Sequence, residues 1–116
     1  MKYTVQPGGS LVGQLRVPGD KSISHRSIML GSIAEGITHV TGFLEGEDAL
    51  ATLDVFKSLG VNIEGPINGE VTIHGVGLHG LTAAAKDLYV GNSGTSIRLL
   101  SGLLVGQEFD SVLTGD

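Results

Sequence analysis

The chain has 116 residues, of which 41% are hydrophobic, and its net charge at pH 7 is −5. This length suits one modest domain with a core, and the negative charge argues against a nucleic-acid partner or an anionic membrane. The sequence contains no cysteine, which excludes disulfides, thiolate nucleophiles and zinc–thiolate sites. Because no stretch has the pattern of a signal peptide or a membrane span, we expect a cytoplasmic protein without a membrane anchor.

The first third of the chain predicts two strands, a helix and a third strand. Residues 3–5 and 11–17 alternate apolar and polar side chains, as half-buried strands do, and the Pro-Gly pair at 18–19 ends the second strand. A helix is expected over about residues 22–34, followed by a short strand at residues 38–42. The face of this helix that we expect to be buried carries Ile23, Leu30, Ile33 and Ala34.

The middle of the chain predicts an amphipathic helix and a hairpin. Residues 48–60 place apolar side chains three or four positions apart, with acidic residues early, a lysine late and a glycine at the end. The apolar stripe comprises Leu50, Leu53, Phe56 and Leu59. Residues 61–64 and 70–74 flank a loop of glycine, proline and asparagine, which is typical of an antiparallel hairpin.

The same pattern begins again near residue 88. We expect a strand at residues 88–90, a glycine-rich turn at 91–95, a helix at 96–105 and a strand at 109–113. The side chains of this helix that we expect to face inward are Ile97, Leu100, Leu103 and Leu104.

The two strand-to-helix turns indicate an internal repeat. At a constant offset of 72 residues, Gly19 aligns with Gly91, Asp20 with Asn92, Ser24 with Ser96 and Arg26 with Arg98, and one residue further Thr41-Gly42 aligns with Thr114-Gly115. This repeat predicts an α+β fold of repeated βαβαββ modules, with one full module and the start of a second. Chance similarity is the alternative, because glycine, serine and threonine are common at such turns.

An incomplete module leaves an apolar face uncovered, so we expect the chain to continue or to need a partner fragment.

Both turns have the composition of an anion site. The first helix opens with Lys21 and Ser22, and Arg26 follows one turn later. Cations there oppose the helix macrodipole unless an anion is present, while the free N–H groups of the first turn attract phosphate or carboxylate. The second turn, residues 91–95, offers glycine backbone without a Cβ and is followed by Arg98. The alternatives are ordinary N-caps, glycine-rich turns and solvated surface charges.

Other patterns in the chain carry less weight. Residues 75–80 match the G-x-G-x-x-G spacing, but no crossover helix and no acidic residue follow at the positions that a dinucleotide site needs. Residues 19–22 resemble the end of a P-loop but lack its glycines, which disfavours a nucleotide kinase. The four histidines show no metal-ligand spacing, so we expect no metal and no cofactor.

The two anion-site motifs together resemble a known family. They are PGDKSISHR at residues 18–26 and GNSGTSIR at residues 91–98. This pair is similar to the N-terminal part of the 5-enolpyruvylshikimate-3-phosphate (EPSP) synthases, and the likeness runs from about Leu11 to Asp116. The sister family, the UDP-N-acetylglucosamine enolpyruvyl transferases, shares the fold but usually has Lys-Asn where this chain has Lys21-Ser22.

The resemblance implies a domain organisation. Members of the family consist of six βαβαββ modules in two domains that close on the substrates, so this chain corresponds to roughly the first quarter. Residues 1–18 would then belong to the other domain of the full enzyme. Residues 19–116 would form the first module and part of the second module of the N-terminal, substrate-binding domain.

The resemblance also implies a reaction, which is transfer of the enolpyruvyl group of phosphoenolpyruvate to the 5-hydroxyl of shikimate 3-phosphate in aromatic amino acid and chorismate biosynthesis. By the family pattern, Lys21 is catalytic and contacts both substrates, and Ser22 and Arg26 bind shikimate 3-phosphate. The Gly94 backbone binds phosphoenolpyruvate, with Asn92 as a weaker candidate.

Two departures from the family limit this interpretation. Leu99 stands where many members have proline, which leaves the sensitivity to the family's inhibitor glyphosate open. The chain also stops before the segment that supplies a phosphoenolpyruvate-binding arginine and before the acid and base groups. We therefore expect the isolated chain to be inactive without the remaining C-terminal part of the enzyme. The alternative is a non-catalytic, anion-binding fragment that complements a second polypeptide.

Overall fold

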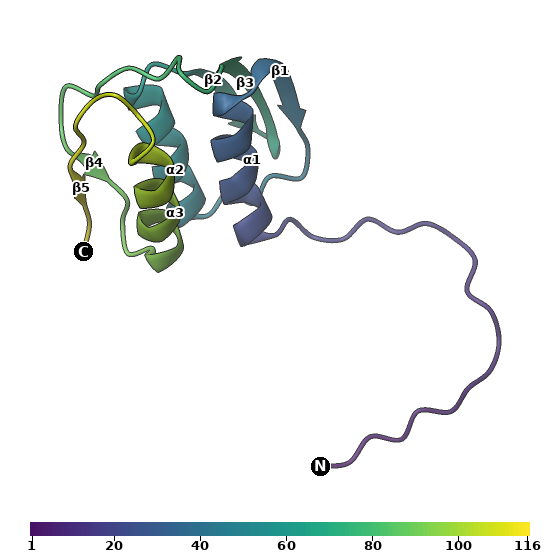
Figure 1. Ribbon diagram of the computed structural model, residues 1–116. Helices are drawn as coiled ribbons and strands as arrows, with labels where there is room; N and C mark the ends of the chain where they lie inside the picture. The colour runs from purple at the N-terminus through teal and green to yellow at the C-terminus, as the bar shows by residue number, and fades with distance from the viewer.

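Three helices and five short strands follow one another in the computed structural model, which describes residues 1–116 (Figure 1). In chain order they are α1 (Lys21–Ile33), β1 (Glu35–Val40), α2 (Glu47–Ser58), β2 (Asn62–Ile67), β3 (Glu70–Val76), β4 (Leu88–Tyr89), α3 (Gly94–Leu104) and β5 (Leu113–Thr114). β1, β3 and β2 form an antiparallel sheet in that order. The helices α1 and α2 lie on one side of this sheet, and α3 lies beside α2 with the short β4–β5 pair. None of the helices combines the length and the apolar character that a bilayer crossing requires.

Helix α1 forms where the sequence predicts it, but a different face of it is buried. Asp20 caps the helix, since its carboxylate accepts a hydrogen bond of 2.8 Å from the backbone N–H of Ile23. Ile23 and Leu30 are 69% and 64% exposed, so their predicted burial is wrong. The face that packs inward carries Ser24, His25, Ile28, Met29, Gly31 and Ser32. Small and polar residues share this face with Ile28 and Met29; a Cβ on Gly31 would lie 2.8 Å from the Ile73 side chain, so α1 lies close to the sheet here.

Helix α2 confirms the predicted apolar stripe. Leu53, Phe56 and Leu59 are buried in the main core, and Leu50 packs against its edge. Glu47 and Asp48 lie in the first turn and Lys57 in the last, as the helix macrodipole favours. The stripe was predictable because its apolar residues recur at helical spacing.

The predicted hairpin is present as β2 and β3, and β1 joins it along the other edge of β3. Thr38, Ile73 and Ile63 lie opposite one another across the three strands. Ile73 and Ile63 are buried against the helices, so this row marks the inner face of the sheet.

The second copy of the pattern begins with a β–α–β unit. β4 and β5 pair in parallel with α3 between them, and Leu100 and Leu104 of α3 are buried as predicted. Leu103 packs at the edge of the core, whereas Ile97 is exposed, contrary to the prediction. The strand predicted at residues 109–113 is reduced to β5, because only its last part has a neighbouring strand to pair with.

Two glycine–glycine contacts support the internal repeat. A Cβ on Gly19 would overlap the carbonyl oxygen of Gly42, and a Cβ on Gly115 would overlap the carbonyl oxygen of Gly91. These are the pairs that the sequence alignment makes equivalent. The N-caps differ by one position, because Asp20 caps α1 whereas Ser93, one residue after the aligned Asn92, caps α3.

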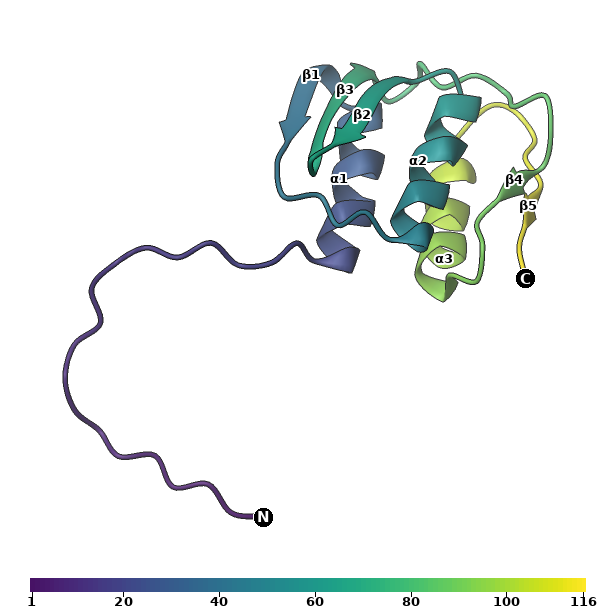
Figure 2. The same ribbon diagram turned by 180° about the vertical axis from the view of Figure 1, so that it is seen from behind.

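The first 20 residues contain no helix or strand and extend away from the folded body (Figures 1 and 2). The strands predicted at residues 3–5 and 11–17 are therefore absent. A strand needs a hydrogen-bonded neighbour, and residues 1–17 make one hydrogen bond to the folded body, of 3.1 Å from the Arg16 guanidinium to the Thr41 hydroxyl.

Candidate functional site

All three helices begin at the same end of the molecule. The first residues of α1, α2 and α3 lie at the lower end in Figure 1, so the three helices run in the same direction. The positive ends of their macrodipoles and their free backbone N–H groups are thereby brought to one side. Anionic groups are favoured at such an end.

The predicted residues of α1 are exposed at this end. Lys21, Ser22 and Arg26 all face solvent in the first turn and a half of the helix. Lys21 forms an ion pair with Asp48 of α2, and its side chain remains 57% exposed. The Arg26 guanidinium donates a hydrogen bond of 3.1 Å to the carbonyl oxygen of Ser22.

The start of α3 repeats this arrangement. Asn92 and Gly94 are exposed, and the Arg98 guanidinium donates a hydrogen bond of 2.8 Å to the carbonyl oxygen of Gly94. Each arginine thus folds back onto the residue four positions before it. A Cβ on Gly94 would meet only the end of the Arg98 side chain, at 3.3 Å, so the main chain here is open to a ligand.

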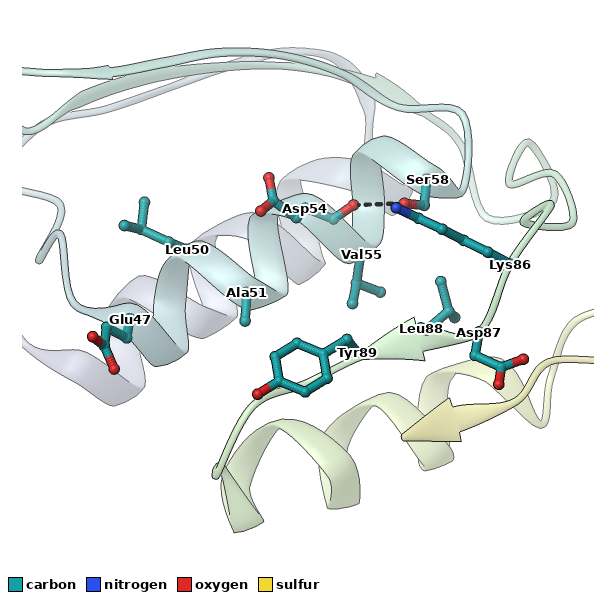
Figure 3. Close-up of a pocket in the computed structure, with 10 residues that line it drawn as sticks. All are labelled: Glu47, Leu50, Ala51, Asp54, Val55, Ser58, Lys86, Asp87, Leu88 and Tyr89. Carbon is teal, nitrogen blue, oxygen red and sulfur yellow. Dashed lines mark hydrogen bonds between the residues drawn. The ribbon is translucent and has the colours of Figure 1, made fainter. Parts of the chain in front are cut away.

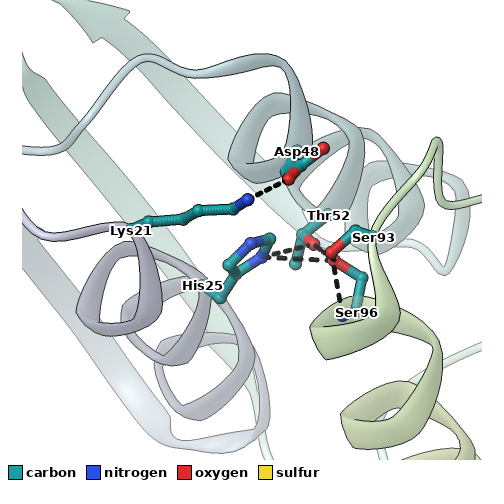
Figure 4. Close-up of polar contacts among 6 residues, drawn as sticks. All are labelled: Lys21, His25, Asp48, Thr52, Ser93 and Ser96. Atoms are coloured by element: carbon teal, nitrogen blue, oxygen red, sulfur yellow. Dashed lines mark hydrogen bonds and ion pairs between the residues drawn. The ribbon is translucent and has the colours of Figure 1, made fainter.

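A buried polar network that the sequence analysis missed connects the three helices (Figure 4). His25 Nδ1 lies 2.8 Å from the Thr52 hydroxyl and 3.4 Å from the Ser96 hydroxyl, and those two hydroxyls are 3.0 Å apart. The Ser96 hydroxyl donates to Ser93 Oγ over 2.8 Å. The available signal was spacing, since His25 follows Lys21, and Thr52 follows Asp48, by one helical turn.

Burial favours the uncharged form of His25. Loss of solvent lowers the pKa of His25 below its usual value of 6.5, and the cations Lys21 and Arg26 lower it further, whereas Asp48 opposes them. The Nε2 atom of this ring is buried without a hydrogen-bond partner. The buried ring of His25 thus lies beneath the exposed charges at the start of α1.

The groove between α2 and β4 is a separate feature (Figure 3). Leu50, Val55, Leu88 and Tyr89 contribute its apolar lining. Three carboxylates and one lysine, Glu47, Asp54, Asp87 and Lys86, border it. This surplus of negative charge disfavours an anion, and none of the predicted site residues lies there.

Two other sequence features lie away from the helix starts. The glycines at residues 75–80 lie in the last part of β3 and in the turn after it, where the backbone N–H of Gly77 donates to the carbonyl of Ala34, just beyond the C-terminal end of α1. A Cβ on Gly75 would overlap that same carbonyl oxygen, so packing of the chain requires this glycine. No three histidine, aspartate or glutamate side chains gather as metal ligands would.

Solved structures of other proteins contain the same fold. The structure aligns with the EPSP synthase from Acinetobacter baumannii with a TM-score of 0.84 and 75% sequence identity, over 90% of this chain and 24% of that one. The chain is therefore an α+β piece of the enolpyruvyl transferase fold.

The sequence comparisons identify the family. The family model for EPSP synthase (3-phosphoshikimate 1-carboxyvinyltransferase) matches residues 5–116, and the chain belongs to this family. It is 67% identical over 116 residues to the 3-phosphoshikimate 1-carboxyvinyltransferase of Nitrosococcus oceani, and 65% identical over 114 residues to that of Methylococcus capsulatus. These two matches cover 100% and 98% of this chain, respectively, but only 26% of each relative. The chain thus spans about a quarter of the length of the curated relatives it matches.

Proposed function

We propose that this chain forms the N-terminal quarter of an EPSP synthase, which transfers the enolpyruvyl group of phosphoenolpyruvate to the 5-hydroxyl of shikimate 3-phosphate and releases phosphate. The observation that carries the proposal is the pair of helix starts, α1 and α3, which present exposed cations and free N–H groups at the same end of the molecule. Both substrates are multiply charged anions. Fixed cations and N–H donors bind such substrates and stabilise charge that shifts during the reaction.

The start of α1 is assigned to shikimate 3-phosphate. Ser22 and Arg26 would bind its phosphate and neighbouring groups, and Lys21 would contact both substrates as the catalytic cation. In support, all three side chains are exposed, and Lys21 is partnered only by a carboxylate that a bound anion would compete with. The Arg26 guanidinium holds only a main-chain carbonyl and can turn to a ligand.

The start of α3 is assigned to phosphoenolpyruvate. The Gly94 backbone would contact it directly, and Asn92 is the weaker candidate. In support, both residues are exposed, and no atom other than the movable Arg98 guanidinium stands within 4 Å of the place of a Gly94 Cβ.

The remaining assignments concern the rest of the enzyme. Residues 1–18 would belong to the other domain, which agrees with their extension away from the folded body. Residues 19–116 would form the first module and part of the second of the substrate-binding domain, in a cytoplasmic enzyme. The partner that completes the site would be the C-terminal part of the same polypeptide.

The test compares three samples in an assay of phosphate release from phosphoenolpyruvate. We expect the full-length polypeptide that carries this chain to release phosphate only when shikimate 3-phosphate is present, and the 116-residue chain alone to release none. A full-length polypeptide without this activity would contradict the proposal. Mixing the chain with a C-terminal fragment tests the alternative, because binding of both substrates without any turnover would indicate a non-catalytic module.

A further inference from the structure

Helices α1 and α2 are connected by two polar contacts that lie one helical turn apart. Lys21 pairs with Asp48, and four residues further along both helices His25 contacts Thr52. Residues at i and i+4 lie above one another on a helix, so the two contacts are stacked between two helices that run in the same direction. The outer contact is open to solvent, whereas His25 and Thr52 are both 0% exposed.

The contact between His25 and Thr52 is linked by a further hydrogen bond to α3. The Ser96 hydroxyl lies 3.0 Å from the Thr52 hydroxyl, and it donates to Ser93 Oγ. Ser93 also caps α3 by accepting from the backbone N–H of Ser96, at 3.1 Å. The chain of contacts from His25 therefore ends at the residue before Gly94, in the turn assigned to phosphoenolpyruvate.

The hydrogens of this network can be placed by counting donors. Each hydroxyl has one hydrogen to donate. Since Ser96 donates to Ser93, it must accept from Thr52, and Thr52 must then accept from His25 Nδ1. Only an imidazole protonated at Nδ1 makes every contact a hydrogen bond, and this leaves Nε2 as the buried atom without a partner. Such an unsatisfied buried atom costs stability, whereas the Nδ1 side of the ring is fully engaged with α2 and α3.

We propose that His25 is a positioning residue, which acts through Thr52 and Ser96 to fix the first turn of α3 relative to the first turn of α1. Lys21 and the Gly94 backbone are thereby held at the spacing at which both contact one phosphoenolpyruvate molecule. This inference rests on the proposed function. Neither His25 nor Thr52 touches a substrate, since both are fully buried.

The inference is tested by substitutions in the full-length polypeptide. Thr52→Val keeps the shape of the side chain and removes the central hydroxyl, and Ser96→Ala removes the next one. His25→Leu removes the donor, whereas His25→Asn keeps an N–H donor close to the position of Nδ1. Ser101→Ala is the matched control for Ser96→Ala, because the Ser101 hydroxyl donates only within α3, to the carbonyl of Ile97, and is exposed.

We expect Thr52→Val, Ser96→Ala and His25→Leu each to raise the KM for phosphoenolpyruvate about tenfold, as displacements of a fraction of an ångström in a substrate site do. The affinity for shikimate 3-phosphate alone, measured by titration, should stay within twofold, because its assigned residues all lie on α1. His25→Asn should restore the KM to within threefold of the unaltered protein, and Ser101→Ala should leave it unchanged.

A KM for phosphoenolpyruvate that stays within twofold in Thr52→Val and Ser96→Ala, with a lowered Tm, would overturn the inference and assign the network to stability alone. Should His25→Leu fail to fold, the two hydroxyl variants decide the outcome. The proposed function is judged separately, because it fails only when the unaltered full-length polypeptide shows no turnover.

Discussion

Replacement of Gly94 by alanine separates a role in the fold from a role in substrate binding. Gly94 begins α3, and its backbone is not in the left-handed region that favours glycine. The added Cβ would lie 3.3 Å from Arg98 Nη2 and 3.9 Å from Arg98 Cζ, and this exposed guanidinium can move aside. Alanine is a better helix former than glycine, so the free energy of unfolding should stay the same or rise by up to about 1 kcal/mol.

Binding of phosphoenolpyruvate should respond in the opposite direction. A methyl group forced into a well-packed contact costs about 1–3 kcal/mol. Because about 1.4 kcal/mol corresponds to a tenfold change in affinity, the KM for phosphoenolpyruvate should rise roughly 5- to 150-fold. The KM is measured by phosphate release from the full-length polypeptide at saturating shikimate 3-phosphate, together with the Tm of each variant.

Gly102→Ala is the matched control for this experiment. Gly102 lies on the same helix, and a Cβ there would meet nothing within 4 Å. This variant should keep the KM for phosphoenolpyruvate and gain stability of a similar size. If Gly94→Ala also kept its KM within twofold of the unaltered protein, the assignment of Gly94 to the phosphoenolpyruvate site would be refuted.

Three further predictions address the proposed catalytic residue Lys21, the core and the buried histidine. Lys21→Ala should lower kcat about 10²- to 10³-fold while the Tm changes little, because the ion pair that it loses is exposed; near-normal turnover would remove Lys21 from the mechanism. Phe56→Ala, at a fully buried position, should lower the free energy of unfolding by about 3–5 kcal/mol, as measured by urea denaturation, and a loss below about 1 kcal/mol would contradict the described core. The pKa of His25 is lower in the folded chain than its usual 6.5, so the unfolded chain binds more protons and stability should fall as the pH drops below about 6.5. Urea midpoints measured between about pH 7.5 and pH 5.5 should show this fall in the unaltered protein and a smaller one in His25→Asn, and identical slopes would contradict it.

The sequence predicted the helices better than it predicted their faces. The stripe of α2 was identified correctly because Leu53, Phe56 and Leu59 are buried for the usual apolar reason. The face of α1 was predicted wrongly because the rule counts apolar side chains, whereas α1 packs through small and polar residues such as Ser24 and His25. The buried His25 finds its partners on α2 and α3, and such partners from other segments are not visible in local spacing.

The position of the candidate site residues was predictable, whereas their role in binding stays a prediction. Lys21, Ser22, Arg26 and Gly94 lie in the first turns of α1 and α3, as expected, because the pattern of a helix start lies within a few consecutive residues. The network beneath them needs His25, Thr52 and Ser96 together, and only the folded chain brings these three positions into contact. The strands expected in the first 17 residues had the correct alternation, but a strand also depends on a neighbour that this part of the chain lacks.

The two glycine–glycine contacts limit how far the two modules can diverge. In the first module Gly42 has a φ of 72° and Gly19 is the residue without room for a Cβ; in the second, Gly91 has a φ of 64° and Gly115 lacks the room. In the first copy the glycine before the helix lacks room for a Cβ, and the glycine after the next strand has the positive φ. In the second copy these two properties are reversed. A substitution at any of these four glycines adds a Cβ where close packing or a positive φ opposes one. The two copies are therefore constrained to the same backbone path by residues that contribute no side chain.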